Sequence, residues 1–94
     1  MLEFDPTSSA AAVLKSLTWP IAPATAQLIE TLCETDGRNP PSRSVRGIYH
    51  DFREVFVYDP RFPRDAIAVV RIVFRVDFGR LKVAIVELST TRPI

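Results

Sequence analysis

Hydrophobic residues change their spacing about halfway along this chain. In the first part, Ala10, Val13, Leu14 and Leu17 recur at i, i+3, i+4 and i+7. This spacing predicts one buried stripe on an amphipathic helix. Asp5-Pro6 reads as its N-cap followed by a proline at the first helical position, and Thr18-Trp19-Pro20 ends it, because proline disfavours helical geometry in the residue before it.

A second helix is predicted to begin near Pro23 and to stop at Gly37, a residue type common just past helix ends. Its apolar face consists of Ala26, Leu28, Ile29, Leu32 and Cys33. Because Cys33 lies on this face, we interpret it as an inert core thiol. The turn-rich segment Asp36–Ser44 follows as a loop.

From Ile48 onward the period is two, which predicts strands at Phe52–Tyr58, Ala66–Asp77 and Leu81–Leu88. The pattern is strongest in Ala66–Asp77, where Val70, Ile72, Phe74 and Val76 point to one face. Gly79 marks a tight turn, so the last two strands should form a hairpin. Met1–Phe4 is short and apolar and fits an edge strand.

The elements therefore run β-α-α-β-β-β, which is an α+β arrangement. Two N-terminal helices are expected on one face of a mostly antiparallel four-stranded sheet. At 94 residues, with 47% hydrophobic and 24% charged residues, the chain fits a single globular domain over residues 1–94.

Charge is unevenly divided between the two halves. Residues 1–37 contain one basic and five acidic residues, a balance of −4, and residues 38–94 contain eleven basic and six acidic residues, a balance of +5. The two sum to the net +1 of the chain. Ten of the twelve basic residues are arginine, whose planar guanidinium suits bidentate binding of phosphate or carboxylate better than the ammonium of lysine does. The second half is therefore where an anionic partner would bind.

Several kinds of chemistry are not expected. The lone Cys33 cannot form an internal disulfide or a thiolate cluster, and one histidine among scattered carboxylates gives no metal-ligand spacing. We expect no metal and no small-molecule cofactor. His50-Asp51 fits either a proton-transfer pair or a solvated histidine beside a strand start.

The surroundings of the protein follow from the same composition. No apolar run approaches the roughly 20 residues of a membrane helix, and the first residues carry Glu3 and Asp5 instead of the positive charge of a signal peptide. We expect a cytoplasmic protein that does not bind membranes.

Arg71 and Arg75 project from one side of an otherwise apolar strand. Burying guanidinium groups in a core is costly, so this side must face solvent or a partner. Two interpretations stay open. The arginines bind phosphate as charge-assisted donors, or they are matched to neighbouring acids such as Glu54 or Glu87.

Four segments resemble the RelE/ParE superfamily of toxins from bacterial toxin–antitoxin systems. Leu2–Leu17 resembles the family's opening strand and first helix. Val45–Val57 (VRGIYHDFREVFV) is similar to its "L-x-G … Y/R-E-L-R-V" strand, and Val70–Asp77 (VRIVFRVD) to its "Y-R-V-I/V-Y-R-V-D" strand. Gly79–Arg92 resembles the last strand and the basic residue after it.

The resemblance implies an endoribonuclease toxin that cleaves ribosome-bound mRNA without metal and is held inactive by a cognate antitoxin. The ribose 2′-OH would attack the neighbouring phosphate, which requires a proton acceptor, a proton donor and cations. It implies catalytic roles for Arg71, Arg92 and Glu54. It further implies RNA contacts by Arg46, Arg53, Arg75 and Lys82.

A second hypothesis is a non-enzymatic member, either a ParE-like gyrase inhibitor or an inactive relative that only binds its partner. It rests on Phe56, which stands where the motif would place arginine, and on the absence of a C-terminal tyrosine.

Overall fold

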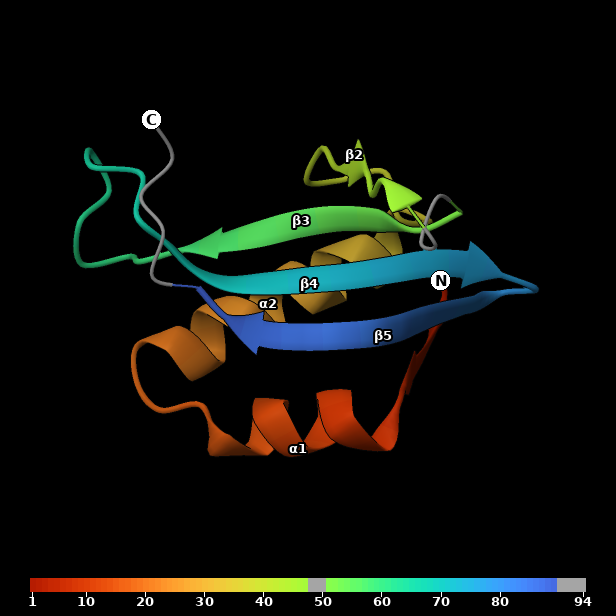
Figure 1. Ribbon diagram of the computed structural model, residues 1–94, viewed down its shortest axis with the longest axis horizontal. Helices are drawn as coiled ribbons and strands as arrows, with labels where there is room; N and C mark the ends of the chain where they lie inside the picture. The colour runs from red at the N-terminus through yellow and green to blue at the C-terminus, as the bar shows by residue number, and fades with distance from the viewer. Residues whose placement is uncertain (48–50, 90–94) are drawn as a thin grey trace.

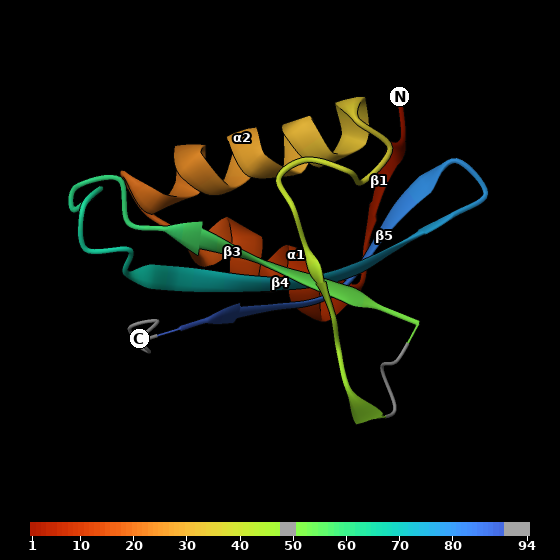
Figure 2. The ribbon, with the colours of Figure 1, turned by 90° about the horizontal axis from the view of Figure 1, so that it is seen from above.

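A computed structural model describes residues 1–47 and 51–89 of the chain. The elements run in the order β1 (Glu3–Pro6), α1 (Ser8–Ser16), α2 (Ile21–Glu34), β2 (Arg43–Ser44), β3 (Arg53–Tyr58), β4 (Ala68–Asp77) and β5 (Arg80–Leu88). α2 crosses behind the sheet and α1 runs beside β5 (Figure 1; Figure 2). Over these residues the fold is therefore α+β, with two helices and one mixed sheet.

The sheet has five strands instead of the four predicted, in the order β1-β5-β4-β3-β2. β1 pairs with β5 in parallel, and the other neighbours are antiparallel. The added strand, β2, lies inside the segment predicted to be a loop. It pairs with β3 at two positions only, Arg43 with Glu54 and Ser44 with Arg53, and two residues are too few to display a period.

The first helix begins two residues later than predicted. Asp5 and Pro6 belong to β1, opposite Lys82 and Val83 of β5, and Thr7 is the N-cap, with its side chain accepting a hydrogen bond from the backbone N–H of Ala10. Pro6 is tolerated because β1 lies at the edge of the sheet, where the missing N–H is not required.

The second helix begins at Ile21, two residues before the predicted start. Pro23 lies in its first turn, where backbone N–H groups have no partner within the helix. Thr25 is buried, whereas Ala26, which was predicted on the apolar face, is exposed. Gly37 lies beyond the helix with φ of 80°, and its N–H donates to the carbonyl of Leu32.

The core lies between the helices and one face of the sheet. Val70, Ile72 and Phe74 of β4 point into it, as predicted, and meet Ile29, Leu32 and other helix residues. Val76 was predicted on the same buried face but is 45% exposed. It lies near the end of β4, where Gly37, after the end of α2, is its neighbour.

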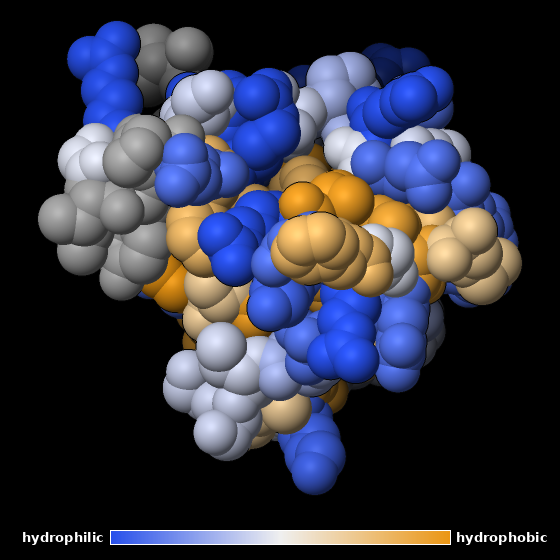
Figure 3. Space-filling model, turned by 90° about the vertical axis from the view of Figure 1, so that its right-hand side faces the viewer, coloured by the Kyte–Doolittle hydropathy of each residue, from blue (hydrophilic) through white to orange (hydrophobic). Residues whose placement is uncertain are grey.

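The predicted hairpin between β4 and β5 is confirmed. Phe78 and Gly79 form its two-residue turn, and both have positive φ, 49° and 75°, as in a type I′ turn. Figure 3 views the end of the molecule that carries this turn, where apolar surface is framed by polar side chains. Phe78 is 98% exposed, so it does not contribute to the core.

Candidate functional site

The face of the sheet turned away from the core, called the open face below, carries the strongest charge cluster. Along β3, Val55 and Val57 point into the core, so the alternating residues Glu54, Phe56 and Tyr58 point to the open face. Strand register brings partners from three other strands to this row. Arg43 lies opposite Glu54, Arg71 opposite Phe56, and Glu87 opposite Arg71.

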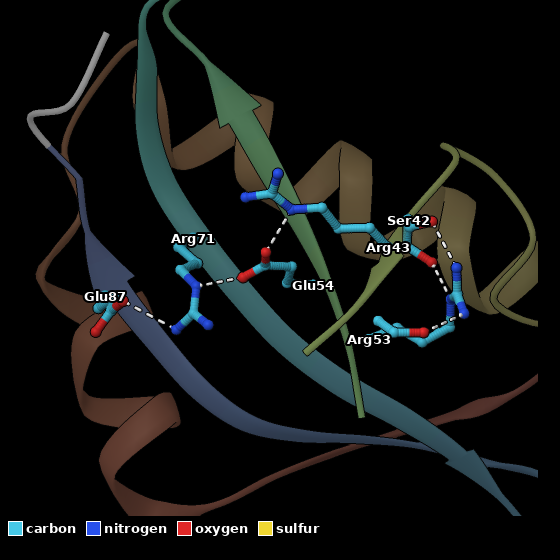
Figure 4. Close-up of polar contacts among 7 residues, drawn as sticks. Ser42, Arg43, Arg53, Glu54, Arg71 and Glu87 are labelled. Atoms are coloured by element: carbon cyan, nitrogen blue, oxygen red, sulfur yellow. Dashed lines mark hydrogen bonds and ion pairs between the residues drawn. The ribbon is translucent and has the colours of Figure 1, made fainter. Parts of the chain in front are cut away.

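Four of these side chains form a charge ladder, Arg43–Glu54–Arg71–Glu87, that crosses β2, β3, β4 and β5 (Figure 4). Glu54 accepts from Nε of Arg43 through Oε1 and from Nε of Arg71 through Oε2, the latter at 2.7 Å. Arg71 Nη1 donates to Glu87 Oε1 at 3.0 Å. The ladder alternates in sign and has no net charge. Of the two interpretations of Arg71, its pairing with Glu54 and Glu87 is the one observed.

The two inner members of the ladder are the least exposed. The Glu54 side chain is 10% exposed and that of Arg71 24%, against 72% for Arg43 and 53% for Glu87. Burial raises the pKa of Glu54, but hydrogen bonds and charge from Arg71 and Arg43 outweigh it, and the pKa lies below its usual range. The pKa of Arg71 is raised because its contacts with Glu54 and Glu87 outweigh burial. At neutral pH the inner pair is therefore ionised.

A hollow of about 1160 Å³ adjoins the ladder and continues around the edge of β3. All four ladder residues line it, together with Phe56 and Tyr58 of β3. The guanidinium of Arg43 lies over the Phe56 ring, 5.4 Å from its centroid. Sequence reasoning missed Arg43 and Tyr58. The alternation of β3 contains the signal for Tyr58, because residues two apart share a face, but nothing local points to Arg43.

Two other candidates, Arg75 and Lys82, lie further along the open face. They are opposite each other in the β4–β5 register, and both contact Asp77 Oδ2, at 3.1 Å and 3.4 Å. Arg75 is four residues from Arg71 along β4, roughly 13 Å in an extended strand. The structure thus separates these cations from the charge ladder.

The remaining candidates do not join either cluster. Arg53 lies opposite Phe74, hence on the core side of the sheet, and its guanidinium donates to the side chain and carbonyl of Ser42 at 2.7 Å and 2.6 Å. Arg46 is an exposed residue that follows β2. Arg92 and His50 fall outside the described residues.

No metal centre is apparent among residues 1–47 and 51–89, where no three potential histidine, cysteine or carboxylate ligands gather. Cys33 is buried, and this burial raises the pKa of its thiol, which fits the interpretation as an inert core residue. Within the same ranges, no helix has the length and apolar character needed to cross a lipid bilayer.

Comparisons with known proteins give little. No family model matches the chain, and no curated protein matches it. Among solved structures, the chain is similar to the solution structure of the conserved hypothetical protein HP0894 from Helicobacter pylori, with 16% sequence identity and a TM-score of 0.48. That match covers 94% of each chain. Neither a family nor a function follows from a likeness of this size.

Proposed function

We propose that this protein is the toxin of a toxin–antitoxin pair and that it cleaves ribosome-bound mRNA without a metal ion. One observation carries the proposal. A carboxylate, Glu54, and two guanidinium groups, those of Arg43 and Arg71, are hydrogen-bonded together on the open face and line a hollow there. Cleavage through the ribose 2′-OH needs such a set, a proton acceptor beside cations that stabilise a charged phosphate.

Glu54 has a lowered pKa in the free protein, and a carboxylate with a lowered pKa is a weak base. We expect the binding of substrate to the ladder to change this pKa. Arg71 contributes to that lowering through a hydrogen bond and its charge. A phosphate that takes over the donors of Arg71 removes part of this contribution and leaves the opposing effect of burial, so the pKa of Glu54 rises when substrate binds.

In the proposed reaction, the 2′-oxygen attacks phosphorus while Glu54 accepts its proton. Arg71 donates to the phosphate oxygens, and the 5′-oxygen leaves with a proton from solvent. The products are a 2′,3′-cyclic phosphate and a 5′-hydroxyl.

The test is cleavage of ribosome-bound mRNA by the purified protein. We expect a 2′,3′-cyclic phosphate product and no cut where the scissile nucleotide carries a 2′-deoxy sugar. Glu54→Gln and Arg71→Lys should each slow cleavage by roughly two to three orders of magnitude, by analogy with the loss of an oxyanion donor. Cleavage of the 2′-deoxy substrate at an undiminished rate would rule out this chemistry.

The same proposal predicts growth arrest when the protein is induced without its antitoxin, with protein synthesis stopping first. The free part of β3 supports a protein partner, because β2 covers only Arg53 and Glu54. Within the described sheet, Val55–Tyr58 has β4 alone as a neighbour, and an extended segment of an antitoxin can pair with such an edge. Normal growth despite abundant folded protein would contradict an active toxin.

A second candidate function is a non-enzymatic member, either a gyrase inhibitor or a relative that only binds its partner. The pairing of Arg71 with two carboxylates favours it, since a phosphate must compete with both acids for the guanidinium of Arg71. Phe56 also stands where the resemblance places arginine. This candidate predicts intact mRNA after induction, and a gyrase inhibitor would stop DNA replication before protein synthesis.

A further inference from the structure

Two aromatic side chains share the open face with the charge ladder. Phe56 and Tyr58 alternate with the core residues Val55 and Val57 on β3 and line the hollow beside Arg71. Phe56 is half-buried, and Tyr58 is 48% exposed. The rings are therefore accessible from the hollow, and neither belongs to the core cluster between the helices and the sheet.

We propose that Phe56 and Tyr58 form a stacking platform for the bases of single-stranded RNA, with Arg43 closing over Phe56. This inference rests on the proposed function, because it assigns the binding of the substrate's bases. Single-stranded RNA is recognised chiefly by stacking of its unpaired bases on aromatic rings and on arginine planes. Phe56 and Arg43 already present such a pair, with the guanidinium 5.4 Å from the ring centroid.

The geometry relates the stacking platform to the phosphate-binding cations. Phe56 lies directly opposite Arg71 in the β3–β4 register, so a base on Phe56 brings its backbone to the charge ladder. Phe56 and Tyr58 are two residues apart, roughly 6.8 Å along a strand. That is about twice the 3.4 Å rise of stacked bases, so the two rings are too far apart to stack on each other and both are open to bases.

RNA explains this combination of residues better than a protein ligand does. Base stacking is tolerant of sequence, whereas the adjoining arginines supply the contacts to phosphate. Arg43 is 72% exposed, so its guanidinium has room to lift from Phe56 and cover an inserted base.

The test measures the affinity of the full chain for a fluorescent oligouridylate of about ten nucleotides. The oligonucleotide is protected from cleavage by 2′-O-methyl groups. Tyr58→Leu and Phe56→Leu remove the aromatic faces but keep apolar side chains. Each should weaken binding on the order of 10-fold, while Tyr58→Phe binds like the original protein. Phe62→Leu is the matched control, because Phe62 is also an exposed ring beneath an arginine, at 5.8 Å, but does not line the hollow.

A second measurement links the rings to bases. A series of oligonucleotides carries one abasic position each, moved in turn along the sequence. At some positions the missing base should lower the affinity of the original protein but leave the affinity of Tyr58→Leu unchanged. Because Tyr58 is exposed, this variant is expected to keep its melting temperature, so a lost affinity is not a lost fold.

The outcomes separate this inference from the proposed function. Binding that ignores both leucine substitutions overturns the stacking platform, and so does cleavage of ribosome-bound mRNA by a protein that does not bind the oligonucleotide. Either result leaves the proposed function standing. If the protein neither binds the oligonucleotide nor cleaves ribosome-bound mRNA, both the stacking platform and the proposed function are overturned. Variants that lose affinity for the antitoxin but not for the oligonucleotide would show that the rings contact protein.

Discussion

Arg71 connects two carboxylates across three strands, and its removal is the most direct perturbation of the charge ladder. Position alone predicts a small effect, since Arg71 points away from the core and surface substitutions usually change stability by about 0.5 kcal/mol or less. The contacts predict more. Arg71→Ala leaves Glu54, whose side chain is 10% exposed, with Arg43 as its remaining guanidinium partner in the described structure.

The magnitude lies between two known limits. Removing one partner of a fully buried ion pair costs about 3–5 kcal/mol, and breaking an exposed pair costs about 0.2–1 kcal/mol. Glu54 is buried but keeps Arg43, so we expect Arg71→Ala to cost about 1–3 kcal/mol. For a domain of this size, that corresponds to a melting temperature lower by roughly 5–20 °C.

The loss should depend on pH with a definite sign. The pKa of Glu54 is lowered in the folded protein, so its ion pairs stabilise the fold above the unfolded pKa of about 4.3. That contribution disappears as pH falls through the lower folded value. The difference between the original protein and Arg71→Ala should therefore be widest at neutral pH and narrow in acid.

Thermal melting of both proteins across this pH range measures the effect. Arg80→Ala serves as control, because Arg80 lies 3.7 Å from Asp5 and both side chains are about half exposed. The control should change stability by about 0.5 kcal/mol or less. Equal losses in Arg71→Ala and Arg80→Ala, or a loss for Arg71→Ala that persists unchanged in acid, would refute the reasoning.

Three further changes test other parts of the structure. Phe78→Asn should stabilise the fold by about 0.5–1 kcal/mol in thermal melting, because asparagine suits the positive φ of this exposed position; an unchanged melting temperature would contradict strain there. Gly37→Ala should lower the free energy of unfolding by about 1–2 kcal/mol, since the φ of Gly37 is 80° and a Cβ would lie 2.7 Å from Val76 Cγ2. Gly47→Ala has similar φ but no neighbour within 4 Å, so an equal loss there would exclude the clash. RNA binding should weaken steeply with salt, and Arg75→Ala should reduce the slope by about one; binding that is flat in salt would mean that the arginines do not contact phosphate.

Local periodicity predicted the elements that repeat their pattern several times. β4 alternates over ten residues, and Val70, Ile72 and Phe74 are buried as expected. The hairpin followed from Gly79, because its turn requires positive φ. Both helices were found for the same reason, although their first residues shifted. Thr7 caps α1, since Asp5 and Pro6 are held in β1 by pairing with a strand more than seventy residues away.

What the sequence did not reveal depends on pairing between distant segments. The two residues of β2 become a strand only beside β3, and the parallel contact of β1 with β5 leaves no local period. The site follows the same rule. A match of Arg71 with Glu54 or Glu87 was one of two interpretations left open by the sequence, but the full ladder depends on register, which also brings Arg43 beside Glu54.

Burial makes the two carboxylates of the ladder unequal partners of Arg71. Glu87 is about half exposed, so water replaces its contact with Arg71 at small cost. Glu54 is buried and cannot be solvated in the same way. Under the proposed function, an incoming phosphate should therefore displace Glu87 first, from the β5 side, and weaken the contact between Arg71 and Glu54 only after that. Under the proposed function, the order of exposure along the ladder thus predicts a direction of approach, with the phosphate entering at the exposed Glu87 end and the proton acceptor Glu54 held at the buried end.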